Sequence, residues 1–144
     1  MNKLGEILII EDSKGDQALF TDALENLNVL NEVIFFEDGD SILKYLNSNL
    51  SINPFLIISD INLPKLSGIE LRDKIYNDSE LALRCIPYLF FTTSAAQADI
   101  VNAYSKSVQG FFVKPDNIFE LEEILDTIIK YWKHCKAPDR LKSV

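Results

Sequence analysis

Five short runs of uninterrupted apolar residues constrain the fold of this chain more than any other feature. The runs cover residues 7–10, 33–36, 55–58, 88–91 and 111–113. A strand that faces solvent on one side alternates apolar and polar residues, whereas a strand covered on both faces reads as a continuous apolar run. The runs therefore predict five strands of a parallel sheet, buried between two layers of helices.

The segments between the runs have the spacing of amphipathic helices. The clearest is the C-terminal one, whose apolar stripe consists of Ile118, Leu121, Leu125, Ile128 and Trp132. Weaker stripes predict helices over residues 15–28, 40–48, 67–77 and 96–106. Right-handed crossovers close such a repeat into an open α/β sheet with helices on both faces. Ligands of such sheets bind beyond the carboxyl ends of the strands.

Composition excludes several classes of protein. A chain of 144 residues with 47% apolar content fills one core without disulfides, so we expect Cys85 and Cys135 to be ordinary reduced cysteines. Fourteen basic against 22 acidic residues leave a net charge of −8, which disfavours direct contact with nucleic acid. No apolar run approaches the roughly 18 residues that span a bilayer. We therefore expect a cytoplasmic protein without membrane contact.

Polar residues follow the apolar runs at the points where the strands are expected to end. They are Glu11 and Asp12, Asp60, Thr92, and Lys114. Because the carboxyl ends of parallel strands meet at one edge, these groups are expected to share a shallow pocket. Three carboxylates in one pocket repel one another, and a hard divalent cation relieves that repulsion. For Asp12 alone, a helix-capping role is the alternative; the constellation favours a Mg²⁺ site.

Asp60 lies where a carboxylate can react. It opens the segment Asp60-Ile-Asn-Leu-Pro64, a strand-to-loop turn with Gly68 beyond it, and is expected to be exposed enough for chemistry. A carboxylate can attack a phosphoryl group when a metal ion and an ammonium group neutralise the charge on the transferring oxygens. Lys114 precedes Pro115, which favours an extended backbone that projects the Lys114 side chain at the pocket.

Taken together, these residues resemble the receiver domain of two-component response regulators. The resemblance spans about residues 5–132. It rests on Glu11-Asp12, on Asp60 in Asp-Ile-Asn-Leu-Pro-Lys-Leu-Ser-Gly, on Thr92 in Phe-Phe-Thr-Thr-Ser, and on Lys114-Pro115. The set is highly specific, whereas any one member is weak. It implies the flavodoxin-like (βα)5 fold of that family.

The resemblance also implies a role for each matching residue. Asp60 corresponds to the phosphoacceptor, and Glu11 and Asp12 to the acidic pair that holds Mg²⁺ together with Asp60. Asn62 corresponds to the residue that gives a backbone carbonyl to the metal.

Two further positions match the residues that contact the phosphoryl group. Thr92 corresponds to the switch hydroxyl and Lys114 to the lysine. Phe111 takes the place of the rotating aromatic, although a plain core phenylalanine explains it equally well. Thr93 departs from the pattern, because many receivers carry a smaller residue there.

As a member of this family, the chain is expected to accept a phosphoryl group from the phosphohistidine of a sensor histidine kinase or phosphotransfer protein. Residues 1–133 would form the receiver domain and residues 134–144 a short tail without an output domain. The signal would then leave through the domain's own surface. Homodimerisation or docking of a target is expected at the face made by the helix 96–106, the fifth strand and the last helix. The Thr-Thr-Ser segment and the Asp-x-Asn-Leu-Pro loop also resemble those of stand-alone receivers that partner phytochrome-type kinases.

Other functions remain as alternatives. A Mg²⁺-dependent aspartyl-phosphate phosphatase of the haloacid-dehalogenase type also places a nucleophilic Asp after a parallel strand, but it has a second Asp as general acid where this chain has Asn62. We therefore expect self-catalysed phosphotransfer and autodephosphorylation, without enzymatic turnover. A receiver that only drains phosphoryl groups from a shared kinase is the other alternative. A flavin module lacks support, because no phosphate-binding loop follows Ile10.

Overall fold

A five-stranded parallel sheet forms the centre of the computed structural model, which describes residues 1–93 and 96–138. The order is β2-β1-β3-β4-β5. The strands are β1 (Ile7–Ile10), β2 (Val33–Phe36), β3 (Leu56–Ser59), β4 (Tyr88–Thr92) and β5 (Gly110–Val113). Each predicted strand is present within one residue of its predicted bounds, and the predicted α/β receiver fold is confirmed.

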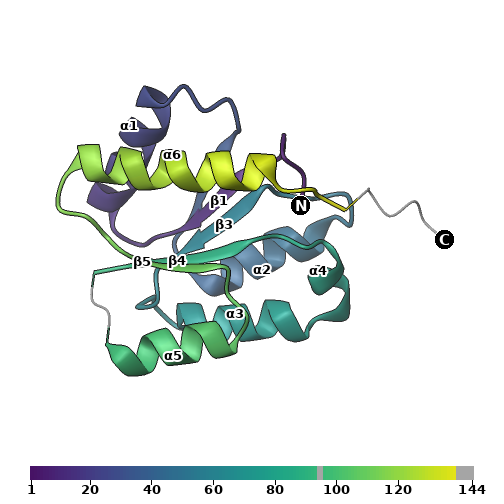
Figure 1. Ribbon diagram of the computed structural model, residues 1–144. Coiled ribbons are helices and arrows are strands. Elements are labelled where there is room, and N and C mark those ends of the chain that lie inside the picture. Colours follow the sequence, from purple (N-terminus) through teal and green to yellow (C-terminus); the bar gives the residue numbers. More distant parts are fainter. Residues whose placement is uncertain (94–95, 139–144) are drawn as a thin grey trace.

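Helices cover both faces of the sheet. They are α1 (Lys14–Asn26), α2 (Gly39–Ser48), α3 (Gly68–Asn77), α4 (Ser79–Leu83), α5 (Gln97–Ser105) and α6 (Ile118–His134). Figure 1 shows α1 and α6 on one face and the remaining helices on the other. The apolar stripe of α6 is confirmed, because Leu121, Leu125 and Ile128 are buried. Its last member, Trp132, is half-buried.

The short helix α4 is absent from the sequence-based expectation. Its five residues are too few to show a helical period. Asp78 caps its N-terminus, and the Asp78 side chain accepts hydrogen bonds from the backbone N–H groups of Glu80 and Leu81. Leu81 is its one buried residue.

Burial of the strands follows their place in the sheet. Every residue of β1, β3 and β4 is buried, with Leu8 and Ile10 in one half of the core and Ile7 and Ile9 in the other. The expectation of full burial is wrong for the other two strands. All of β2 is half-buried, and Val113 of β5 is 49% exposed. The sheet order places these two strands at the edges, where the helical layers end.

Short connections bring the carboxyl ends of the strands close to the helix starts. Only three residues separate β1 from α1, and Ser13 begins that helix by accepting a hydrogen bond from the backbone N–H of Asp16. Asn117 begins α6 in the same way. Among the described residues, no helix is long and apolar enough to cross a bilayer. Ser94 of the Thr-Thr-Ser motif and most of the predicted tail, residues 139–144, lie outside the description.

Candidate functional site

Three carboxylates meet at the carboxyl ends of β1 and β3, as predicted. Glu11, Asp12 and Asp60 each offer an oxygen, and these oxygens lie within 4.8 Å of one another. Glu11 and Asp60 are buried, whereas Asp12 is exposed. One side of the cluster is therefore closed by protein, and the Asp12 side is open to solvent.

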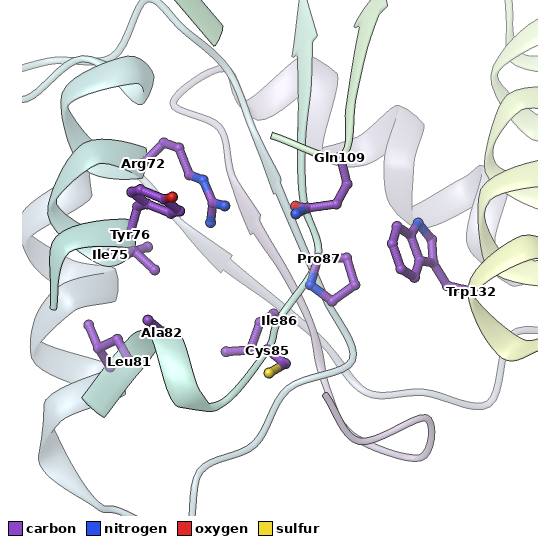
Figure 2. A pocket seen from close by; sticks show the side chains of 10 residues that line it. All are labelled: Arg72, Ile75, Tyr76, Leu81, Ala82, Cys85, Ile86, Pro87, Gln109 and Trp132. Atoms are coloured by element: carbon purple, nitrogen blue, oxygen red, sulfur yellow. The ribbon is translucent and has the colours of Figure 1, made fainter. Parts of the chain in front are cut away.

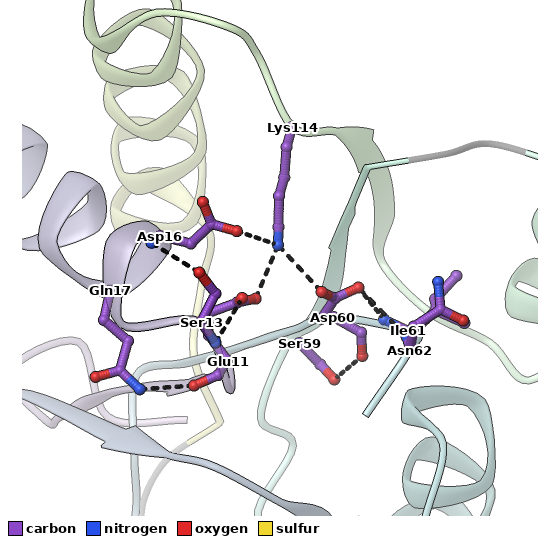
Figure 3. Close-up of polar contacts among 9 residues, drawn as sticks. All are labelled: Glu11, Ser13, Asp16, Gln17, Ser59, Asp60, Ile61, Asn62 and Lys114. Carbon is purple, nitrogen blue, oxygen red and sulfur yellow. Dashed lines mark hydrogen bonds and ion pairs between the residues drawn. The ribbon is translucent and has the colours of Figure 1, made fainter. Parts of the chain in front are cut away.

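Lys114 reaches across this cluster from the end of β5 (Figure 3). Its Nζ lies 2.9 Å from Glu11 Oε2, 3.0 Å from Asp60 Oδ2 and 2.8 Å from Asp16 Oδ2. An ammonium group has three hydrogens, and each has a carboxylate acceptor here. The predicted projection of Lys114 into the pocket is confirmed.

Asp16 is the partner of Lys114 that sequence reasoning missed. It lies in the first turn of α1, where an acidic residue is ordinarily explained by the helix dipole. The available signal was its place in the first turn of a helix that starts at the pocket, because helical side chains tilt toward the helix N-terminus and hence toward the strand end.

The loop after Asp60 is built around a close backbone approach. Asp60 Oδ1 accepts from the backbone N–H of Ile61 at 2.7 Å and, more weakly, of Asn62 at 3.4 Å. Gly68 N–H donates to the Ile61 carbonyl at 2.8 Å. A Cβ on Gly68 would lie 2.0 Å from the Asp60 carbonyl oxygen, so only glycine permits this return of the chain.

Asp60 is largely enclosed, and whether it is exposed enough to react stays a prediction. The residue is 8% exposed, because Lys114 reaches across its carboxylate and the loop through Gly68 packs against its backbone. One carboxylate oxygen faces backbone amides and the other faces the ammonium group. The side chain is thus held in one orientation.

Burial and charge shift two pKa values in the cluster. Burial raises the pKa of the Glu11 carboxyl from an ordinary 4.5 to about 7, although its hydrogen bond with Lys114 opposes the shift. Burial alone would lower the pKa of the Lys114 amine, but the hydrogen bonds to Asp16, Glu11 and Asp60 outweigh it and raise that pKa. Three carboxylates contact this one ammonium group, and Asp12 lies beside two of them. Such an excess of hard oxygen donors fits a divalent cation such as Mg²⁺.

Thr92 is buried beside this cluster without joining it. Its backbone carbonyl accepts from the Lys114 N–H at 2.8 Å, but in the described part of the chain its buried Oγ1 has no hydrogen-bond partner. A buried hydroxyl without a partner is rare and costs stability.

Three other positions were predicted from the resemblance, namely Asn62, Thr93 and Phe111. Asn62 and Thr93 are exposed, and the predicted metal contact of the Asn62 carbonyl stays a prediction. Phe111 is half-buried with its ring centroid 6.0 Å from that of Phe90. Whether it changes position stays a prediction as well.

Comparisons with known proteins agree with this geometry. The family model described as the response regulator receiver domain matches residues 7–126. The response regulator Rcp1 of Synechocystis sp. is 31% identical over 130 residues, which cover 88% of this chain and 87% of that protein. A probable methanogenesis regulatory protein, FilR2, of Methanothrix harundinacea is 30% identical over 88% of this chain and 82% of its own length.

Solved structures show the same similarity. The phosphorylated cyanobacterial phytochrome response regulator RcpA superposes with a TM-score of 0.81 at 32% identity, covering 94% of this chain and 98% of that one. The Mn²⁺-bound form of Rcp1 superposes with a TM-score of 0.79 at 30% identity, covering 92% and 97%.

Proposed function

This chain belongs to the family of response regulator receiver domains, and we propose that it is a phosphorylation-controlled switch whose phosphoacceptor is Asp60. The observation that carries the proposal is the pairing of Asp60 with Lys114, 3.0 Å apart, inside a cluster of three carboxylates. This arrangement supplies a nucleophile, an ammonium group and the donors of a cation site in one pocket.

The reaction that fits these groups is transfer from a phosphohistidine. An oxygen of Asp60 forms a bond to phosphorus, the bond from phosphorus to the histidine nitrogen breaks, and that nitrogen keeps the electron pair. Lys114 neutralises charge on the transferring oxygens by turning one N–H from a carboxylate to the phosphoryl group. The Thr92 hydroxyl, buried and without a partner among the described residues, has a hydrogen to donate to that group.

Glu11, Asp12, Asp60 and the Asn62 backbone carbonyl are the proposed Mg²⁺ ligands. When bound, the ion offsets the negative charge of the carboxylates and of the incoming phosphoryl group. The carboxylate set supports this assignment, as does the Mn²⁺-bound form of the similar protein Rcp1. The exposed Asp12 side leaves room for the waters that Mg²⁺ keeps.

The family and Asn62 argue against a turnover phosphatase. A haloacid-dehalogenase enzyme needs an acid two residues after its nucleophile, and the Asn62 amide cannot donate such a proton.

We propose that the partner carries a phosphohistidine and is a sensor histidine kinase or a phosphotransfer protein. We also propose that the protein acts in the cytoplasm. RcpA, a phytochrome response regulator, makes a phytochrome-type kinase the first class to test.

For output we propose the face formed by α5, β5 and α6, with homodimerisation or docking of a target there. Polar residues predicted for this face are Asn102, Ser105, Lys106, Glu123 and Lys130. It also exposes apolar side chains, among them Val101, Tyr104 and Phe119. Sedimentation with and without a stable phosphoryl mimic tests this output. If neither self-association nor partner capture changes, the phosphate-sink alternative replaces it.

Incubation with acetyl phosphate and Mg²⁺, followed by intact mass measurement, tests the phosphoacceptor. We expect one added phosphate in the wild type and none in Asp60→Asn, because an amide is not a nucleophile here. Asp12→Asn should weaken Mg²⁺ binding by about tenfold or more in a direct titration. The matched control is Asp22→Asn, which removes an exposed carboxylate from α1. Phosphate retained by Asp60→Asn would assign the reaction to another residue.

A further inference from the structure

We propose that Asp16 is a positioning residue that competes with the phosphoryl group for Lys114 and thereby restrains phosphorylation of Asp60. The inference rests on the proposed function and concerns a residue that the assignment of phosphoacceptor, metal ligands and switch hydroxyl does not use. Asp16 approaches the ammonium from α1, whereas Asp60 approaches from the end of β3 (Figure 3).

The hydrogen-bond capacity of Lys114 is full. Its contact with Asp16, at 2.8 Å, is as short as any it makes. An ammonium group has three N–H donors and all three have carboxylate acceptors, so a bond to a phosphoryl oxygen requires the release of one carboxylate. Both the rate and the extent of phosphorylation therefore depend on how readily one of these contacts breaks.

Exposure decides which carboxylate is released. The Asp16 side chain is 33% exposed, compared with 2% for Glu11 and 10% for Asp60. A carboxylate that can be rehydrated is released more readily than one that would be left unpaired inside the protein. Asp16 is thus the partner that the phosphoryl group displaces.

Asp16 is also separate from the metal cluster. Among the described residues, the carboxylates that gather within 4.8 Å are those of Glu11, Asp12 and Asp60, and Asp16 is not one of them. Its negative charge is therefore not required as a ligand, yet it opposes an incoming phosphoryl dianion. Both effects, competition and repulsion, act in the same direction.

Asp16→Asn tests the inference with little change of shape. The amide oxygen still accepts a hydrogen bond, but the charge that holds the ammonium is gone. At saturating Mg²⁺ we expect acetyl phosphate to label Asp60 about threefold to tenfold faster than in the wild type. The gain should shrink at high salt, which screens the charge, and Asp16→Glu should return the rate toward wild type.

Asp22→Asn is the matched control, because it removes an exposed carboxylate from the same helix without touching the pocket. It should label at the wild-type rate. A rate for Asp16→Asn equal to or below that of the wild type would overturn the inference, as would an equal gain in Asp22→Asn. These results differ from failure of the proposed function, in which the wild type itself takes up no phosphate.

Discussion

Two cations are enclosed at opposite ends of the sheet, and their partners differ. Lys114 lies at the carboxyl end among carboxylates, which raise the pKa of its amine. Arg72 of α3 lies near the amino ends of β4 and β5, where it is 6% exposed and lines a cavity of about 290 Å³ (Figure 2). Burial lowers the pKa of its guanidinium, although Tyr88 and Tyr76 oppose the shift.

Arg72 is held by groups that carry no full charge. Its Nε and Nη2 donate to the carbonyls of Lys106 and Ser107 at 3.0 and 2.8 Å, beyond the last residue of α5. Its guanidinium carbon lies 5.4 Å from the ring centroids of both Tyr76 and Tyr88. The cation thus complements the negative end of the α5 dipole.

The contrast separates a structural cation, Arg72, from Lys114, the cation to which we assign a function. Two backbone carbonyls and two rings contact Arg72, and none of these groups carries a charge that would attract a further ion. Lys114 cannot neutralise the three carboxylates that it contacts, so its surroundings favour the arrival of positive charge, and in the proposed function they change when a phosphoryl group enters. Removing each cation, or one of its partners, should therefore affect different properties of the protein.

The largest effect on stability is expected from Arg72→Met. The change removes two charge-assisted hydrogen bonds and two ring contacts while keeping most of the side-chain volume, so unfolding in urea should cost about 2–4 kcal/mol less. Labelling of Asp60 should persist wherever the variant is folded. Lys74→Met, an exposed change on the same helix, is the control. Equal stability of the two variants would show that Arg72 does not hold α5.

An intermediate effect is expected at Glu11, and it depends on pH. The folded pKa, about 7, exceeds the ordinary value of 4.5, so the folded state binds more protons between these values. The contribution of Glu11 to unfolding free energy is therefore present below about pH 4.5 and lost as pH rises through 7. In EDTA, the stability of Glu11→Gln relative to wild type should rise by about 1–3 kcal/mol between pH 5 and 8. Parallel stability curves would contradict the shift.

The smallest effect is expected at Thr92. Valine has the same shape and removes a buried hydroxyl that has no partner among the residues described, so Thr92→Val should leave the unfolding free energy unchanged or raise it by up to about 1 kcal/mol. The same variant should still accept phosphate but lose the phosphorylation-dependent amide shifts of α5. A lower unfolding free energy in Thr92→Val would mean that the Thr92 hydroxyl has a hydrogen-bond partner in the unphosphorylated protein.

Prediction from sequence succeeded where the signal is local. Lys114 directly follows one apolar run and Asp60 comes two residues after the end of another, and parallel strands bring their carboxyl ends together whatever the details of packing. It gave no expectation for Arg72, because the carbonyls that hold this side chain lie 34 and 35 residues away. A lone arginine in an amphipathic helix ordinarily indicates a solvated face.

The sequence by itself determined the strands, the alternation of strands and helices, and the identity of the acids that gather at one edge of the sheet. Each of these is encoded by an apolar run, or by a polar residue close after one. Only the tertiary structure decided that β2 and β5 are edge strands, that Asp60 is enclosed, and that Asp16 takes the third N–H of Lys114. The physical reason is that burial and hydrogen-bond capacity are shared among segments far apart in the chain. They are settled only when all of these segments pack together.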